Sequence, residues 1–363
     1  MTFAGTADAV YRTRLRGCLL GGALGDALGK PVELESLANI RQPVELVPDE
    51  HGVAEITDDT QMTLFGLEGF QRGWVRAQAK GISGALGALV REGYLRWLDT
   101  QEHPAPPPAD AGHRSGRLRL EPWLYARRGP GSACLSGLRA SFTPQPYAEL
   151  TGRPGPVNPD SKGCGTVMRS APFGFAGRPE GAFVLAANCA QITHGHPTGY
   201  YAAGAFAAMI AYLFEGESVE GAVLRLMRLL ARHPGHEETA AALRRALDLV
   251  EAGDPGPERV ESLGGGWVAE EALAIAVYAA LAPTRISAPA GHLKSVVFKE
   301  KLRLAVTHSG DSDSTGSICG NLLGAASGEE VLPFEWLTRL EGRTTITRLA
   351  DDFATETART VSY

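Results

Sequence analysis

Several features that would assign a chain to a specialised class are missing from this sequence. No apolar run approaches the roughly 18 to 20 uninterrupted residues of a membrane-spanning helix. The five cysteines are scattered and contain no CxxC pair, which argues against a zinc knuckle or a disulfide framework and favours a reducing compartment. With 35 Lys and Arg against 41 Asp and Glu, the chain has no basic excess for binding nucleic acid. We therefore expect a cytoplasmic protein that acts on a small ligand.

The first apolar segment resembles a secretory signal only superficially. Arg12, Arg14 and Arg16 precede it, but Asp26 interrupts the stretch "GCLLGGALGDALG", in which glycine is dense. The segment also continues into "KPVELE" without a convincing cleavage site. We therefore expect a helix of the folded protein here, and no membrane among its partners.

Helical periodicity dominates the chain, and few stretches alternate as strands do. With 363 residues, 44% of them hydrophobic, the chain is long enough to bury a sizeable core. Helices of similar character lie on both sides of every loop, so we predict one all-α domain over residues 1–363. The stretch 102–116, rich in proline and small residues, is expected to be a mobile loop. The predicted helices are 7–29, 58–73, 81–99, 180–193, 198–214, 218–232, 237–252, 268–282, 291–306 and 314–327.

The apolar patterns of two segments predict one buried helix and one surface helix. Residues 197–216 begin with a proline, end with a glycine and carry small apolar residues throughout, which is typical of a helix buried on most faces. Residues 238–253 carry a one-sided apolar stripe instead. We expect the first at the core and the second on the outside.

Glycine recurs every fourth residue along the first predicted helix, at Gly17, Gly21, Gly25 and Gly29. Each glycine in a helix interior costs up to about 1 kcal/mol, so a favourable contact must offset the stripe. The pattern indicates either the close approach of a second helix backbone alone, or an approach that also brings Asp26 and Glu33 toward a site.

Two adjacent acids lie between two threonines, at Thr57, Asp58, Asp59 and Thr60, just before the apolar run "QMTLFGLEGF". In one interpretation Thr57 caps a helix and the two acids interact favourably with its dipole. In the other, two carboxylates and a threonine hydroxyl offer the hard oxygen ligands that Mg²⁺ prefers. The stretch by itself leaves both interpretations open.

A second oxygen-rich helix start lies about 250 residues later, in "THSGDSDSTGSICGNLLG". In an extended turn the side chains of Asp311 and Asp313 point the same way, and Ser314 adds a hydroxyl. An EF-hand loop fails here because Leu322 stands where its bidentate glutamate is required. A plain helix cap is again the alternative.

Together the two helix starts predict a metal centre. Four aspartates gathered in one place repel one another strongly unless cations bind between them. Two metal ions about 3.5 to 4 Å apart are a common arrangement for clamping a reacting oxygen. The chemistry that this arrangement implies is metal-assisted hydrolysis.

A third segment, "DSKGCGTVMRSAPFG" at 160–174, places Gly163 and Gly165 around Cys164 before a predicted helix. Backbone N–H groups in such a loop can approach a phosphate. Cys164 is also a candidate nucleophile, although no base for it is identifiable. His194 and His196 follow in "QITHGHPTG", either as site residues or as structural hydrogen-bond donors.

The motifs "GCLLGGALGDALGKPVE", "TDDTQM", "SKGCGTVMR", "ITHGHP" and "HSGDSDSTGSICGNLLGA" occur in this order across nearly the whole chain. With them the sequence resembles the ADP-ribosylglycohydrolase family. The resemblance implies a compact, orthogonal multi-helix bundle with a cleft that holds two Mg²⁺, or Mn²⁺, ions.

The resemblance also implies roles for individual residues. Glu33, Asp59 and Asp311 are the candidate catalytic carboxylates. The implied metal ligands are Thr57, Asp58, Asp59, Asp311, Asp313 and Ser314. The implied substrate-binding residues are Asp160, Ser161, Lys162, Gly163, Cys164, Gly165 and His194. Ser314 stands where many members have threonine, Cys164 where several have asparagine, and Lys162 where an aromatic can stand, which puts substrate preference in question.

The activity that the resemblance implies is hydrolysis of the C1″ glycosidic bond between ADP-ribose and an acceptor such as an arginine or serine side chain. The alternatives are another ADP-ribose conjugate, such as O-acetyl-ADP-ribose or ADP-ribosylated nucleic acid, and a non-catalytic, crystallin-like ADP-ribose-binding member. The expected partners are ADP-ribose and ADP-ribosylated proteins or small conjugates, with nucleic acid only as a modified substrate. We expect the protein to be a monomer.

Overall fold

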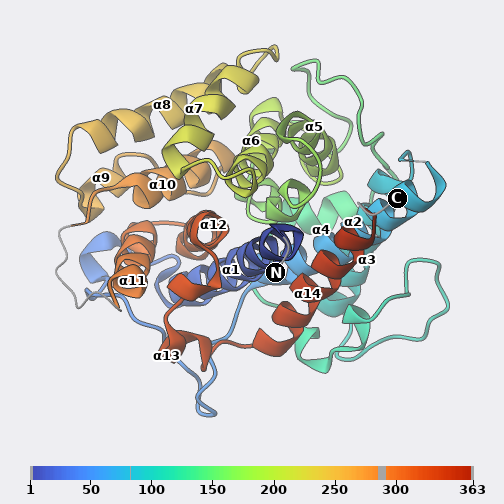
Figure 1. Ribbon diagram of the computed structural model, residues 1–363, viewed down its shortest axis with the longest axis horizontal. Coiled ribbons are helices and arrows are strands. Elements are labelled where there is room, and N and C mark those ends of the chain that lie inside the picture. Colours follow the sequence, from blue (N-terminus) through green and yellow to red (C-terminus); the bar gives the residue numbers. More distant parts are fainter. Residues whose placement is uncertain (1–2, 82, 285–291, 361–363) are drawn as a thin grey trace.

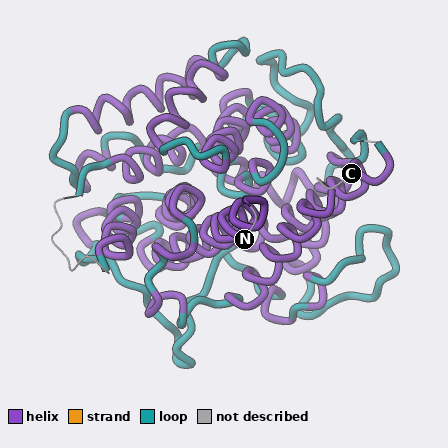
Figure 2. The backbone as a smooth tube through the Cα atoms, in the orientation of Figure 1, coloured by secondary structure: helices purple, strands orange, loops and turns teal. Residues whose placement is uncertain are grey.

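The computed structural model describes residues 3–81, 83–284 and 292–360, and all regular secondary structure in these ranges is helical (Figures 1 and 2). Within these ranges the β-bridges Ala54–Leu340 and Gly163–Val268 are isolated and belong to no strand. The prediction of an all-α fold is confirmed. The helices are α1 (Phe3–Gly29), α2 (Asp58–Lys80), α3 (Leu86–Glu102), α4 (Ser132–Arg139), α5 (Pro179–Ala190), α6 (Pro197–Phe214), α7 (Val219–Leu230), α8 (Glu237–Glu251), α9 (Pro257–Glu261), α10 (Ala269–Leu281), α11 (Leu293–Val306), α12 (Ser312–Ser327), α13 (Phe334–Leu337) and α14 (Arg343–Thr360).

Every predicted helix is present, with ends displaced by up to seven residues. The largest difference is at the end of α2, which continues to Lys80 and stops at Gly81, whose φ of +65° is a left-handed conformation that suits glycine. The predicted start of α11 at residue 291 lies outside the described residues. Four helices were not predicted from the sequence, namely α4, α9, α13 and α14.

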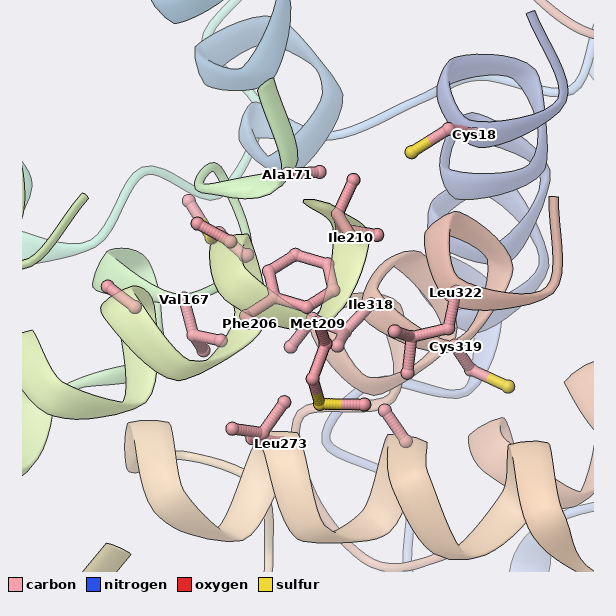
Figure 3. Packing of buried hydrophobic residues seen from close by; sticks show 14 of the residues in the cluster. Cys18, Val167, Ala171, Phe206, Met209, Ile210, Leu273, Ile318, Cys319 and Leu322 are labelled. Atoms are coloured by element: carbon pink, nitrogen blue, oxygen red, sulfur yellow. The ribbon is translucent and has the colours of Figure 1, made fainter. Parts of the chain in front are cut away.

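The core is built around α6, which is buried along nearly its whole length. It packs against α5, α10 and α12, and Figure 3 shows Met209 of α6 between Leu273 of α10 and Ile318 of α12. The stripe on α8 packs against α10, and the rest of α8 faces outward in Figure 1. Both predicted placements, α6 inside and α8 outside, are confirmed.

The glycine stripe of α1 lies against a matching stripe on α12. A Cβ atom on Gly25 would lie 1.9 Å from the carbonyl oxygen of Gly316, and one on Gly21 would lie 2.4 Å from that of Gly320. Since no side chain fits between them, the two backbones are in direct contact. This contact places Asp26 of α1 near the first turn of α12, where Asp313 lies.

The loop between α3 and the 3₁₀ turn Leu118–Leu120 is fixed to α3 by two arginines. Arg114 makes a bidentate ion pair with Asp99 at 2.9 and 3.0 Å, and Arg96 donates to the carbonyl oxygen of His113 at 3.1 Å. These contacts do not measure motion, so the mobility of residues 102–116 stays a prediction, as does the single domain. In the described residues no helix has both the length and the hydropathy needed to cross a lipid bilayer.

Candidate active site

A cavity of about 300 Å³ opens where the first turns of α2, α4 and α12 meet the loop 161–165. A larger hollow of about 680 Å³ lies between α2 and α14, but it gathers no comparable set of reactive groups. The smaller cavity brings together most residues predicted for the site. Those on its wall are Glu33, Asp58, Asp59, Ser161, Gly163, Cys164, Gly165, His194, Asp311, Asp313 and Ser314.

The first turn of α2 is held from below by a side chain of α1. Thr57 caps the helix, because its hydroxyl accepts from the Asp59 amide at 3.3 Å. The carboxylate of Asp26 accepts from the amides of Thr57 and Thr60 at 2.9 and 3.1 Å. Thr57 itself does not line the cavity, whereas Asp58 and Asp59 do. The cap interpretation is therefore correct, and the cap directs two acids into the cavity.

The first turn of α12 lies across the cavity from these acids. The Asp311 amide donates to the carbonyl oxygen of Gly265 at 2.8 Å, and Asp313 accepts from the Ser314 amide at 3.0 Å. The Cys164 thiol donates to Asp311 Oδ2 at 2.7 Å. Two segments about 250 residues apart in the chain thus meet at one cavity, as the sequence predicted.

The acids at this site destabilise each other's charged forms. Burial, together with repulsion from Asp313, raises the pKa of both Asp26 and Glu33 to about 7. The same two causes raise the pKa of Asp58, Asp59 and Asp311 well above the usual range. Among the described residues no Lys, Arg or His forms an ion pair with any of these carboxylates. These carboxylates therefore have no cationic side chain among the described residues to balance a negative charge.

The chemistry of these groups suits a hard divalent cation. Oδ1 of Asp59 is buried and has no hydrogen-bond partner among the described residues, and carboxylate and hydroxyl oxygens are the ligands that Mg²⁺ and Mn²⁺ take. As the side chains lie, however, no three His, Cys, Asp or Glu residues in the described ranges form a group that could hold a metal ion. The donors fit the cation in kind, and the metal centre stays a prediction.

The loop 161–165 is fixed to the residues before α10. The Cys164 amide donates to the carbonyl oxygen of Trp267 at 3.0 Å, and the Ala269 amide donates to that of Lys162 at 2.8 Å. The side chain of Lys162 does not line the cavity, because it pairs with Glu238 at 2.6 Å and with Glu270. Of the predicted substrate-binding residues, Lys162 and the exposed Asp160 thus lie off the cavity wall.

The two candidate histidines have different roles in the structure. His194 is buried on the cavity wall, where burial and the charge of Arg169 lower its pKa to about 3. His196 caps α6 by accepting from the Thr198 amide at 3.2 Å. The structural interpretation therefore holds for His196, while His194 lies at the site.

Trp267, which was not predicted from the sequence, lines the cavity with 45% of its surface exposed. From the sequence, Asp26 was expected only as a residue that the glycine stripe could bring toward a site, whereas its carboxylate organises the start of α2. A sequence signal existed for Asp26, because a lone acid in an apolar, glycine-rich helix has to find buried donors. For Trp267 the only signal is the preceding "GGG", which marks a loop but not its position.

Comparisons with known proteins find similar chains over nearly the whole length of this one. The model of the family described as ADP-ribosylglycohydrolase matches residues 7–361. The chain is 24% identical to ADP-ribosyl-[dinitrogen reductase] glycohydrolase of Rhodospirillum rubrum, covering 90% of each chain. It is 26% identical to ADP-ribosylhydrolase ARH3 of Bos taurus, covering 93% of this chain and 91% of the other. A solved structure titled "ADP-ribosylglycohydrolase-related protein complex" superposes with a TM-score of 0.63 at 25% identity and covers 96% of this chain and 99% of its own.

Proposed function

This protein belongs to the ADP-ribosylglycohydrolase family, and from that membership we propose that it hydrolyses the C1″ glycosidic bond between ADP-ribose and an acceptor side chain such as arginine or serine. The observation that carries the proposal is the meeting of the carboxylates of α2 and α12 in one cavity beside the loop 161–165. Hydrolysis joins the water oxygen to C1″, breaks the bond from C1″ to the acceptor and transfers the water proton to the departing acceptor. The products are ADP-ribose and the free acceptor.

The cavity offers backbone donors for the two phosphates of ADP-ribose. The first turn of α4, from Ser132 to Cys134, lines one wall, and its N–H groups have no partner within the helix. Gly163 and Gly165 line the facing wall, where a Cβ on Gly165 would lie 2.7 Å from the Cys134 sulfur. Side chains on these two residues would narrow the space into which a diphosphate fits.

Glu33 is the carboxylate best suited to move the proton. It is only half-buried, it lines the cavity, and its pKa of about 7 lies where a group can both accept and release a proton near neutral pH. Asp59 and Asp311 are more deeply buried alternatives. In this scheme Glu33 accepts the proton of the attacking water and passes it to the acceptor.

We propose two Mg²⁺ ions as cofactors, with Mn²⁺ as the alternative, held by Thr57, Asp58, Asp59, Asp311, Asp313 and Ser314. The support is the cluster of buried carboxyl groups among these residues and the unpartnered Oδ1 of Asp59. When bound, such ions supply Lewis-acid polarisation of substrate or water oxygens. The protein's part is to aim the two helix starts at one point.

The test is a hydrolase assay on arginine-, serine-, O-acetyl- and nucleic-acid-linked ADP-ribose in parallel, with Mg²⁺, with Mn²⁺ and with chelator. We expect release of ADP-ribose from at least one conjugate, and a loss of about a hundredfold or more in kcat for Glu33→Gln. Glu220→Gln, on the exposed start of α7, is the matched control and should be unchanged. Absence of turnover on the whole panel, with ADP-ribose still bound, would favour the non-catalytic binding function instead.

A further inference from the structure

Three buried polar side chains form a chain of hydrogen bonds beneath the cavity. Arg169, Thr193 and His194 are each at most 2% exposed. Arg169 Nη2 donates to Thr193 Oγ1 at 2.6 Å, and Thr193 Oγ1 lies 2.7 Å from His194 Nδ1. Only the histidine at the end of this chain reaches the cavity wall.

The guanidinium of Arg169 is an unusual group to bury here, because no carboxylate among the described residues pairs with it. Its other neighbours are the sulfurs of Cys134 and Met62, at 3.5 and 3.7 Å, and the ring of Tyr94, at 4.5 Å from its centroid. Since a guanidinium can only donate, the direction of its bond to Thr193 is fixed.

The bond from Arg169 uses one lone pair of the Thr193 oxygen, and the hydroxyl hydrogen is free to point at a separate acceptor. Two acceptors are in reach, the carbonyl oxygen of Ala190 at 3.4 Å and His194 Nδ1 at 2.7 Å. The shorter contact has the length of a good hydrogen bond, and the longer one does not. The hydroxyl therefore donates to Nδ1, and a neutral imidazole whose Nδ1 accepts carries its hydrogen on Nε2.

Nε2 lies on the side of the ring nearest the loop 161–165, and this loop lines the cavity. A Cβ on Gly163 would lie 3.1 Å from Nε2, which places this edge of the ring against the loop 161–165. Nε2 makes no hydrogen bond to any residue in the part of the chain that the structure describes. An N–H group in this position is available to a ligand.

We propose that Arg169 and Thr193 are positioning residues that fix His194 in the Nε2–H tautomer, so that it donates a hydrogen bond to an acceptor oxygen of the substrate. The inference rests on the proposed function for the identity of that substrate, ADP-ribose, but the tautomer itself belongs to the free protein. It assigns His194 to recognition of a ribose or phosphate oxygen and leaves proton transfer to the carboxylates. Arg169 has a second effect, because its charge disfavours a second proton on the ring.

The test combines a spectroscopic readout with a matched pair of variants. The protein is labelled on its nine histidines, and long-range proton–nitrogen NMR spectra assign the His194 ring by comparison with His194→Gln. We expect a neutral ring protonated on Nε2 in the free protein at neutral pH. Thr193→Val keeps the side-chain shape and removes the hydroxyl, so it should give a mixture of tautomers, whereas Thr193→Ser should keep the Nε2–H form.

Binding supplies the second readout. Calorimetry should show that Thr193→Val weakens ADP-ribose binding by about tenfold, the equivalent of one lost hydrogen bond, while Thr193→Ser changes it by less than about twofold. Thermal melting verifies that both variants are folded. An Nδ1–H ring or a charged ring in the wild type overturns the inference, and so does a Thr193→Val spectrum that matches the wild type.

The same experiments separate this inference from the proposed function. If the wild type has the Nε2–H ring and Thr193→Val loses it, the role of Arg169 and Thr193 in fixing the tautomer is supported whatever the substrate. If ADP-ribose then fails to bind the wild type, the proposed function is wrong, and the role of Arg169 and Thr193 stands. If ADP-ribose binds equally to Thr193→Val and wild type, the donor role of His194 is wrong.

Discussion

At the scale of single residues, a substitution of Trp267 can test whether the nucleobase of a substrate stacks on this ring. Its ring is 45% exposed on the cavity wall. Stacking of a base on an aromatic ring contributes about 1 to 3 kcal/mol, so Trp267→Ala should raise the Kd for ADP-ribose by about 5- to 150-fold. We expect kcat to change little, because the ring is not among the reacting carboxylates.

Isothermal calorimetry measures this effect directly, and Trp267→Phe is the matched control because it keeps an aromatic surface. A Phe variant that binds like the wild type, beside an Ala variant that does not, indicates stacking. Equal binding by all three proteins would mean that the base lies elsewhere.

His308 is expected to make the folded protein less stable in acid. It is fully buried, its Nε2 lies 2.9 Å from Thr315 Oγ1, and its Nδ1 has no partner among the described residues. Burial lowers its pKa from 6.5 to about 4, so the folded protein binds this proton more weakly than the unfolded chain does. The contribution of the neutral His308 ring to the free energy of unfolding is fully present above pH 6.5 and declines as the pH falls from 6.5 toward 4.

From this group alone the free energy of unfolding should fall by about 2 kcal/mol between pH 7.5 and pH 5. Urea unfolding at the two pH values measures the change. His308→Gln cannot gain the proton, so we expect it to be less stable at pH 7.5 but to lose less on acidification. An equal acid loss in both proteins would show that other groups dominate.

At the scale of elements, the contact between α1 and α12 is the feature on which the position of the site depends. Gly25→Ala would place a methyl group 1.9 Å from the carbonyl oxygen of Gly316, which is backbone and cannot turn aside. The two helices would have to separate. We expect destabilisation by about 3 kcal/mol or more, within the range of severe overpacking.

Gly181→Ala is the matched control, because a Cβ on this residue of α5 meets no atom within 4 Å. Here the same chemical change should stabilise the protein by up to about 1 kcal/mol, the difference in helix propensity. Thermal melting compares the two variants. If Gly25→Ala melts with the wild type, the helices can separate freely and the stripe has no packing role.

The elements that sequence could predict are those with strong local signals. The start of α2 was predicted to the residue, because a threonine cap followed by two acids sets it. The helix α14 was missed although Ile346, Leu349, Ala350 and Phe353 form a buried stripe at helical spacing. Its many β-branched threonines lower the intrinsic helix propensity, and packing against α1 and α2 overcomes that preference.

At the scale of the whole molecule, the sequence could identify the two halves of the site but not the distance between them. Composition and spacing indicate oxygen donors at Asp58 and at Asp311, and both reach one cavity. Lys162 shows the limit of such reasoning, because its motif belongs to the site while its side chain pairs with α8 and α10. Which way a side chain turns depends on residues distant in sequence, here Glu238 and Glu270.

Because α2 and α12 meet at one cavity, we expect binding of the proposed ions there to stabilise the whole fold. A cation that binds the folded protein and not the unfolded chain stabilises by about 2.7 kcal/mol at a hundred times its Kd. We therefore expect Mg²⁺ or Mn²⁺ to raise the melting temperature of the wild type above its value in chelator.

Asp59→Asn tests whether this gain arises at the cavity. In chelator the variant should melt no lower than the wild type, because it removes a buried carboxylate whose raised pKa reflects an unfavourable charge. With Mg²⁺ the variant should lose most of the gain, because one carboxylate ligand is replaced by an amide. Glu220→Gln, on the exposed start of α7, should behave as the wild type in both conditions.

Calorimetric melts with and without the ion measure all three proteins. An Asp59→Asn protein that melts well below the wild type in chelator, yet gains as much from Mg²⁺, would mean that Asp59 is a structural residue and that the cation binds elsewhere.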